Sequence, residues 1–268
     1  MYLKQAKDLL AKEYKLRRAE NAKGFRLEVM DEKIRHSYQV LGVGNFLLKH
    51  EPYFANFSEE EKDYFRATVL LHDVGRFYEI LKIGEGERID HGVHGAEMLY
   101  KIPEFSAPDV VLPVRHHGHL IEALYEDEEY QALSDEMKDR VKHITFLVRD
   151  ADKLANFYLL VSLFEEMSPL FFVESAFKNP HNKYLTDVAK GDFLAHRTVL
   201  VNHITNFAEK ALGYLSWVYD LNYDASFVYM DKLSIVSRLE KLFERYIDKN
   251  EAKIMYAELD KYIRQRKS

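Results

Sequence analysis

Histidine and aspartate residues that could bind a metal occur in a defined order along the chain. They are His36, the adjacent pair His72 and Asp73, then His91, the adjacent pair His116 and His117, and the segment Asp150-Ala151-Asp152. Imidazole and carboxylate groups are common ligands of first-row divalent metals. Because the chain has no cysteine, thiolate ligands are excluded, and a metal must be held by nitrogen and oxygen donors.

We expect four of these groups to surround one cation. If His72 and Asp73 are consecutive residues of a helix, their side chains point about 100° apart and can bind an ion that lies between the two directions. The imidazole of His36 and one later carboxylate would complete the set. Such mixed ligands suit Mn²⁺, Fe²⁺, Co²⁺, Ni²⁺ or Mg²⁺. An octahedral ion with four protein ligands keeps two positions open, for a water and a phosphate oxygen, which indicates hydrolysis.

The elements that must position these groups are predicted to be helices. Apolar residues recur at three- and four-residue intervals over 31–50, 58–73 and 134–163, which is the period of an amphipathic helix. Ser58 followed by Glu61 is typical of a capping box at the start of the second helix. Periodicity does not decide which aspartate is the last ligand, because residues 150 and 152 lie on two edges of one apolar stripe of the third helix.

The rest of the chain is also predicted to be helical, with few interruptions. Gly75 is expected to end the helix that carries His72, and the prolines between 103 and 113 predict a broken connector. Further helices are expected over 193–220, 226–249 and 251–264. No alternating apolar pattern requires a sheet, so the predicted fold class is all-α.

Length and charge restrict the class of protein further. The 268 residues suffice for one large domain plus an extension, and we expect a core over 1–185 with a C-terminal helical extension, 186–268, packed on it. The net charge of −6 does not favour nucleic acid as a partner. No apolar stretch approaches the ~20 residues of a membrane span, and the N-terminus lacks a signal peptide's apolar core, so the expected location is the cytoplasm.

The order of a lone histidine, an adjacent His-Asp pair and a distant aspartate resembles the HD phosphohydrolase superfamily. The resemblance runs from about His36 to Asn156, and it implies an HD-domain helical bundle with additional C-terminal helices. Two stretches carry it: Leu70-Leu71-His72-Asp73-Val74-Gly75-Arg76-Phe77 and Asp90-His91-Gly92-Val93-His94-Gly95-Ala96. The segment from Ser216 to Asn222 looks like that of an uncharacterised bacterial HD group, which names no substrate.

The resemblance also implies roles for single residues. The superfamily's Ala-Asp-x-Leu signature matches Ala151-Asp152-Lys153-Leu154, which favours Asp152 as the last ligand and leaves Asp150 to orient a ligand histidine. The candidates for binding a second metal ion are His91, His116 and His117. Arg76 and Lys153 are the candidates for holding phosphate.

The activity implied by the resemblance is metal-dependent phosphohydrolysis. The expected substrate is a phosphate ester of a nucleotide or another small phosphorylated metabolite, cleaved by metal-activated water that Asp73 helps to position. Two alternatives stay open. One is a nucleotide sensor that binds metal without turnover, and the other is an HD-type di-iron oxygenase.

Overall fold

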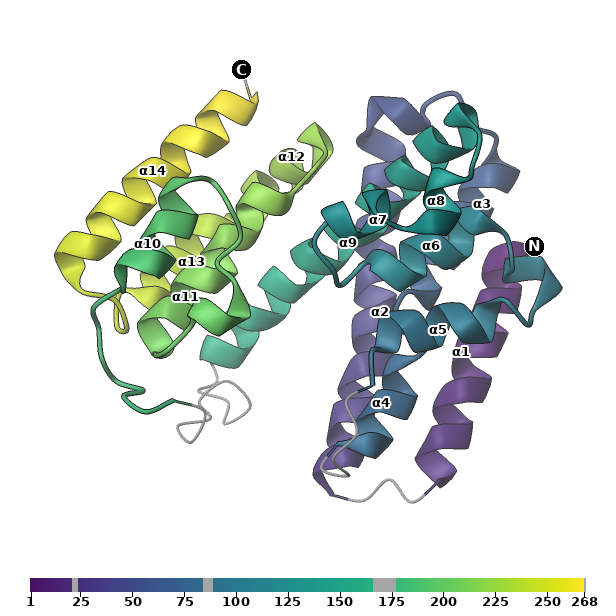
Figure 1. The fold of residues 1–268 in the computed structure, drawn as a ribbon, viewed down its shortest axis with the longest axis horizontal. Coiled ribbons are helices and arrows are strands. Elements are labelled where there is room, and N and C mark those ends of the chain that lie inside the picture. Colours follow the sequence, from purple (N-terminus) through teal and green to yellow (C-terminus); the bar gives the residue numbers. More distant parts are fainter. Residues whose placement is uncertain (21–23, 84–88, 166–176, 268) are drawn as a thin grey trace. The chain divides into compact units, whose positions relative to one another are not determined.

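All regular secondary structure in the described part of the protein is helical. The computed structural model describes residues 1–20, 24–83, 89–165 and 177–267, and these ranges contain helices and no strand, as Figure 1 shows. The predicted all-α class is therefore confirmed. None of the described helices is long and apolar enough to span a membrane.

The chain divides into two compact units, Met1–Asp152 and Lys153–Ser268. The boundary lies inside the long helix α9 (Asp135–Glu165), which continues from the first unit into the second. It falls earlier in the chain than the division at residue 185 that the sequence analysis gives. The proposed core over 1–185 and extension over 186–268 stay a prediction.

The first unit is built from helices that pack around one apolar core. Its elements are α1 (Tyr2–Ala19), α2 (Phe25–His50), η1 (Pro52–Phe54), α3 (Glu59–Leu71), α4 (Arg76–Lys82), α5 (His91–Leu99), η2 (Pro103–Phe105), α6 (Pro108–His116), α7 (Glu122–Tyr125), α8 (Glu128–Gln131) and the first part of α9. The helix α3 packs against both α1 and α2, and α5 packs against α6, as can be followed in Figure 1. The side chains of Leu70, Phe77 and Leu112 are fully buried in this core.

The helix that precedes the His-Asp pair starts as expected and ends earlier than expected. Ser58 and Glu61 form a capping box at its start, which confirms that prediction. The helix ends at Leu71, and residues 72–75 form a turn, so the prediction that Gly75 ends it was wrong. Two backbone hydrogen bonds between residues three apart stabilise this turn: the Val74 N–H donates to the Leu71 carbonyl oxygen (3.0 Å), and the Arg76 N–H donates to the Asp73 carbonyl oxygen (2.9 Å).

The proline-containing segment between residues 103 and 113 is more helical than predicted: it consists of η2 and the start of α6, with a break at residues 106–107. Pro103 and Pro108 occupy first-turn positions of η2 and α6. Proline is tolerated there because a first-turn residue has no helical partner for its N–H. Pro113 lies within α6, where the surrounding buried valines and leucine hold the helix in place.

The second unit consists of short helices. They are the last part of α9, α10 (Asp187–Leu194), η4 (Val201–His203), α11 (Phe207–Ser216), η5 (Trp217–Asp220), α12 (Asp224–Lys232), α13 (Ile235–Phe243) and α14 (Lys249–Lys267). The last of these confirms the helix expected over 251–264. The other two predicted helices are broken, because the Asn206 side chain starts a new helix by accepting the Glu209 N–H and Ser234 has a positive φ of 51°.

Candidate metal centre

Four side chains from three parts of the first unit meet at its centre, and we call them the first cluster: His36, His72, Asp73 and Asp152. His36 lies on α2, the pair lies in the turn after α3, and Asp152 lies on α9. His36 Nε2 is 2.8 Å from Asp152 Oδ1. His72 Nε2 is 3.6 Å from that same oxygen and 3.6 Å from Asp73 Oδ2. Ligand atoms of His36, His72 and Asp73 all lie within 4.8 Å of one another.

These separations fit a single cation. Ligands about 2.1 Å from an octahedral ion are about 3.0 Å apart at neighbouring positions and about 4.2 Å apart at opposite ones. His72 gives an independent test of the fit. Its Nδ1 donates to the Val69 carbonyl oxygen at 2.8 Å, while its buried Nε2 has no hydrogen-bond partner among the described residues. Because a buried polar atom without a partner is costly, a cation between Asp73 and Asp152 would remove that cost.

Asp73 also belongs to a second group, which we call the second cluster: Asp73, His91 and His117. Asp73 Oδ1 lies 3.3 Å from His91 Nε2 and 3.5 Å from His117 Nε2, and the two nitrogens are 3.1 Å apart. His117 Nδ1 donates to the Val114 carbonyl oxygen at 2.7 Å, so its Nε2 faces the carboxylate. Asp73 therefore presents one oxygen to each cluster.

Two glycines let His91 come close to Asp73. A Cβ on Gly75 would lie 2.3 Å from the backbone oxygen of His91 and 2.6 Å from the backbone nitrogen of Gly95. On the other side of α5, a Cβ on Gly92 would lie 2.6 Å from the backbone oxygen of Arg115. The helix α5 thus contacts the turn and α6 through backbone atoms, which leaves no space for larger residues.

The charged groups around Asp73 keep it ionised. Burial opposes ionisation, but the positive charges of Arg76, Lys33 and His72 outweigh it and hold the pKa of Asp73 well below its ordinary value. The Lys33 Nζ lies 3.4 Å from Asp73 Oδ2, and the Arg76 Nε lies 3.3 Å from Oδ1. Burial also opposes ionisation of Asp152, whose pKa is nevertheless held well below its ordinary value, mainly by its hydrogen bond with His36.

The pKa values of His72 and His91 are shifted in opposite directions. Burial lowers the pKa of His72, but the neighbouring carboxylates Asp73 and Asp152 outweigh it and the pKa is raised. A positive charge at its Nε2 is thus favoured, whether a proton or a metal ion carries it. Burial lowers the pKa of His91 to about 3 against the opposing effect of Asp73. His91 is therefore neutral, which is the form that binds metals.

Arg76 lies against the second cluster. Its NH2 is 2.7 Å from His91 Nε2, its Nε contacts Asp73, and its NH1 donates to Glu79 Oε2 at 2.6 Å. Arg76, Glu79 and His91 also line a cavity of about 350 Å³, together with Ile89, Asp90, Gly92, Arg115, Gly118 and His119. A cavity that contains two guanidinium groups, each with a carboxylate nearby, therefore adjoins the second cluster.

Three residues singled out from the sequence lie outside the two clusters. His116 Nε2 is 2.8 Å from Asp127 Oδ2, so the paired histidines face different partners. The Lys153 Nζ lies 2.9 Å from Asp220 Oδ2 within the second unit. Asp150 is fully buried on α9. A ligand role for His116, a phosphate-binding role for Lys153 and an orienting role for Asp150 stay predictions.

The sequence analysis missed several residues that support the clusters. Lys33 precedes His36 by three residues on α2, and this spacing could have placed it on the same helix face. Glu79, three residues after Arg76, could have been found in the same way. Arg149 is fully buried and donates to the backbone carbonyl oxygens of His116 (3.3 Å), His117 (3.2 Å) and His119. No local pattern indicates that long-range contact.

A known protein family matches the part of the chain that carries both clusters. Residues 34–156 match the sequence model of the HD domain. This segment belongs to the HD-domain superfamily. Comparisons with curated proteins and with solved structures found no match. The HD domain includes every residue of the two clusters, and its superfamily consists generally of metal-dependent hydrolases, so the buried His and Asp groups are suited to divalent metal.

Proposed function

We propose that the HD domain is a metal-dependent phosphohydrolase that cleaves a phosphate ester of a nucleotide or another small phosphorylated metabolite. The observation that carries the proposal is the buried Nε2 of His72, which has no hydrogen-bond partner among the described residues and lies 3.6 Å from a carboxylate oxygen of Asp73 and of Asp152. A site built only for stability would pair this nitrogen with a donor or acceptor. A site built for a cation leaves it free.

We assign the first cluster as the ligand set of one Mn²⁺, Fe²⁺, Co²⁺, Ni²⁺ or Mg²⁺ ion. When bound, such an ion supplies Lewis acidity, which makes a water molecule more acidic and offsets charge that develops on a phosphate. Asp73 stays ionised beside its three cationic neighbours. It can therefore bind the ion through one oxygen and accept a hydrogen bond from the attacking water through the other.

Substrate binding is assigned to the cavity beside the second cluster. Its volume of about 350 Å³ lies at the lower end of the range for small-molecule sites. Arg76 and Arg115 line it, and guanidinium groups suit phosphate oxygens in charge and geometry. Arg115 is held by Asp127 at 2.8 Å, so its position is fixed before a substrate arrives. These features support a small phosphorylated substrate.

We further propose that one ion, rather than two, binds this centre. The second cluster has suitable ligand spacing, but Arg76 already places a positive charge 2.7 Å from His91 Nε2 and 3.3 Å from Asp73 Oδ1. The same two atoms would have to bind a second ion. In this assignment Arg76 supplies the second positive charge beside Asp73.

Asp73→Ala tests the proposed activity. We expect the purified protein to contain a divalent metal and, with added Mn²⁺ or Fe²⁺, to release phosphate or a nucleoside monophosphate from at least one member of a panel of nucleotides, cyclic dinucleotides and phosphomonoesters. Asp73→Ala should lose the metal and lower the rate at least ~100-fold, since metal-site residues act together. The control is Glu60→Ala, which removes an exposed carboxylate from α3.

The other outcomes separate the alternatives. Metal and activity retained in Asp73→Ala would refute the assigned site. Metal binding with nucleotide affinity that depends on the metal, but no turnover, would identify a sensor. Oxygen consumption by the iron-loaded protein, without release of phosphate, would identify an oxygenase.

A further inference from the structure

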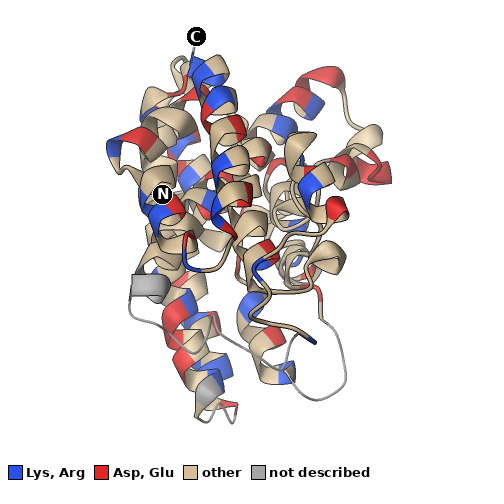
Figure 2. Ribbon diagram, turned by 90° about the vertical axis from the view of Figure 1, so that its left-hand side faces the viewer, with Lys and Arg blue, Asp and Glu red and all other residues tan. Residues whose placement is uncertain are grey.

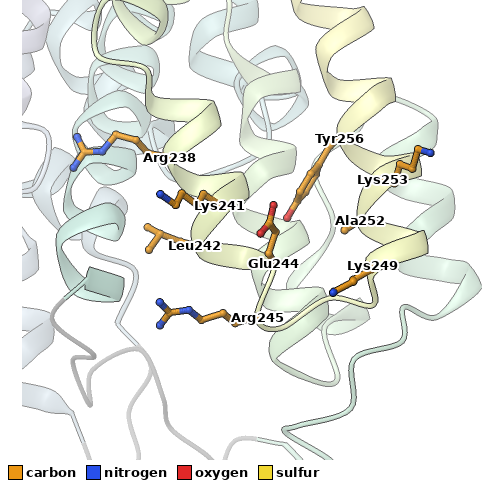
Figure 3. Close-up of a pocket in the computed structure, with 9 residues that line it drawn as sticks. All are labelled: Arg238, Lys241, Leu242, Glu244, Arg245, Lys249, Ala252, Lys253 and Tyr256. Carbon is orange, nitrogen blue, oxygen red and sulfur yellow. The ribbon is translucent and has the colours of Figure 1, made fainter.

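The second unit contains a larger cavity that has no part in the proposed phosphohydrolase site. It has a volume of about 940 Å³ and is lined by residues of α13, α14 and the turn between them, drawn in Figure 3. The lining residues are Arg238, Lys241, Leu242, Glu244, Arg245, Lys249, Ala252, Lys253 and Tyr256. We call it the basic pocket, since five of these nine side chains are cationic.

Helical spacing brings the positive charges together. Arg238 and Lys241 are three residues apart on α13, and Arg245 follows in the turn. On α14, Lys249 and Lys253 are four residues apart, so they lie on one face of that helix. The opposite face of α13 is fixed in the core by Ile235, Leu239 and Phe243, which are almost completely buried. The basic residues of α13 must therefore remain on its outer side, and Figure 3 shows Arg238, Lys241 and Arg245 to one side of Glu244 and Tyr256, with Lys249 and Lys253 on the other.

Four of these cations form no ion pair with the part of the chain that the structure describes. Within the described residues, no carboxylate lies within ion-pair distance of Lys241, Arg245, Lys249 or Lys253. Three of the four basic residues farther along α14 are paired instead: Lys261 with Glu258, Arg266 with Asp224, and Lys267 with Asp231. Elsewhere in the ribbon, basic and acidic segments alternate along the helices, as Figure 2 shows. Unneutralised like charges around one cavity favour a multivalent anion.

The basic pocket also has an apolar side. Leu242 and Tyr256 are half-buried and Ala252 is buried. The Tyr256 hydroxyl donates to the Glu240 carbonyl oxygen at 3.1 Å, which fixes the position of the ring. A fixed aromatic ring beside several cations can contact a flat, apolar group of a ligand while the cations bind its phosphates.

We propose that the basic pocket binds a nucleoside di- or triphosphate at a site separate from the phosphohydrolase centre. Lysine and arginine are the usual phosphate-binding residues, and the volume is sufficient for a nucleotide. The cations gather in one cavity rather than along an extended stripe, and the chain has a net charge of −6. Both observations favour a small anion over nucleic acid or an anionic membrane.

Equilibrium binding of ATP and of inorganic tripolyphosphate to the full chain tests this proposal. EDTA is present throughout, so that metal-dependent binding at the other centre does not contribute. We expect Lys241→Ala/Lys253→Ala to weaken binding at least tenfold, and Glu244→Gln to strengthen it several-fold because a repulsive carboxylate is removed. The matched control is Lys261→Ala/Lys267→Ala, which changes the net charge equally outside the pocket.

The two ligands separate the two parts of the pocket. Tighter binding of ATP than of tripolyphosphate, with the difference lost in Tyr256→Ala, would support a nucleoside-binding role for the ring. Equal binding of both would overturn that role. Three results would overturn the site itself: no binding of either anion, equal loss in the two double variants, or replacement of anion binding by pocket-dependent binding to RNA or to phosphatidylserine vesicles. Circular dichroism melts of each variant establish that it is folded.

Discussion

Replacing Arg76 with methionine should allow a second metal ion to bind beside Asp73. An ion about 2.1 Å from His91 Nε2 could be no farther than about 4.8 Å from the Arg76 NH2, which lies 2.7 Å from that nitrogen. For a divalent ion and a unit charge, Coulomb's law gives a repulsion of about 1.7 kcal/mol in a dielectric of 80 and about 7 kcal/mol in a dielectric of 20. Even the smaller value weakens binding of the second ion by about 20-fold.

The number of metal ions per chain measures this effect directly. Proteins dialysed against Mn²⁺ and then freed of loose metal should contain one ion per chain for the wild type and for Arg76→Lys, which keeps the charge. Arg76→Met should contain close to two, with the electron paramagnetic resonance signal of a coupled manganese pair. The double variant Arg76→Met/His91→Ala should return to one. Two ions of equal affinity in the wild type, or one ion in Arg76→Met, would refute the reasoning.

Two further predictions concern stability. Gly75→Ala should lower the free energy of unfolding by about 2–4 kcal/mol in urea titrations, because the new Cβ would meet the backbone of His91 and Gly95 at 2.3 and 2.6 Å. Gly42→Ala, where nothing lies within 4 Å, should instead stabilise α2 slightly, and equal effects of the two changes would contradict the close approach. Burial, with Asp260 and Glu244 adding to it, raises the pKa of Glu240 from 4.5 to about 7, so stability should fall as the pH rises through this interval. Glu240→Gln should remove that dependence and stabilise the protein by about 1–3 kcal/mol at pH 8, and an unchanged pH slope in thermal melts would argue against it.

The choice between Asp150 and Asp152 as the last candidate ligand shows what the sequence pattern can predict and what requires the fold. Helical periodicity left residues 150 and 152 equivalent, and the family resemblance favoured Asp152. In the fold, Asp152 Oδ1 lies 2.8 Å from His36 Nε2, whereas Asp150 is fully buried outside the cluster. A difference of two residues turns a side chain by roughly 200° about the helix axis, and only the packed neighbours show which direction faces the histidines.

The sequence by itself determined the local features: the all-α class, the capping box at Ser58, and the order of the histidines and aspartates that meet at the centre. The helices and the cap depend on residues within one or two helical turns of each other, so the spacing of apolar residues indicates them. The order of histidines and aspartates was interpreted through its resemblance to the HD superfamily. The sequence did not predict the helix breaks near Asn206 and Ser234. One capping hydrogen bond or one positive φ is enough to end a helix there, although the apolar residues keep their helical spacing across the break.

Only the tertiary structure decided which groups lie close enough to share a cation. It placed His117 rather than His116 beside Asp73, brought Lys33 and Arg76 to the same carboxylate, and set α5 at backbone distance from the turn. Each of these contacts joins residues far apart in the sequence or depends on how helices pack. Close packing of the core fixes the distances of about 3 Å between such groups. These distances cannot be predicted from the spacing of residues in the sequence.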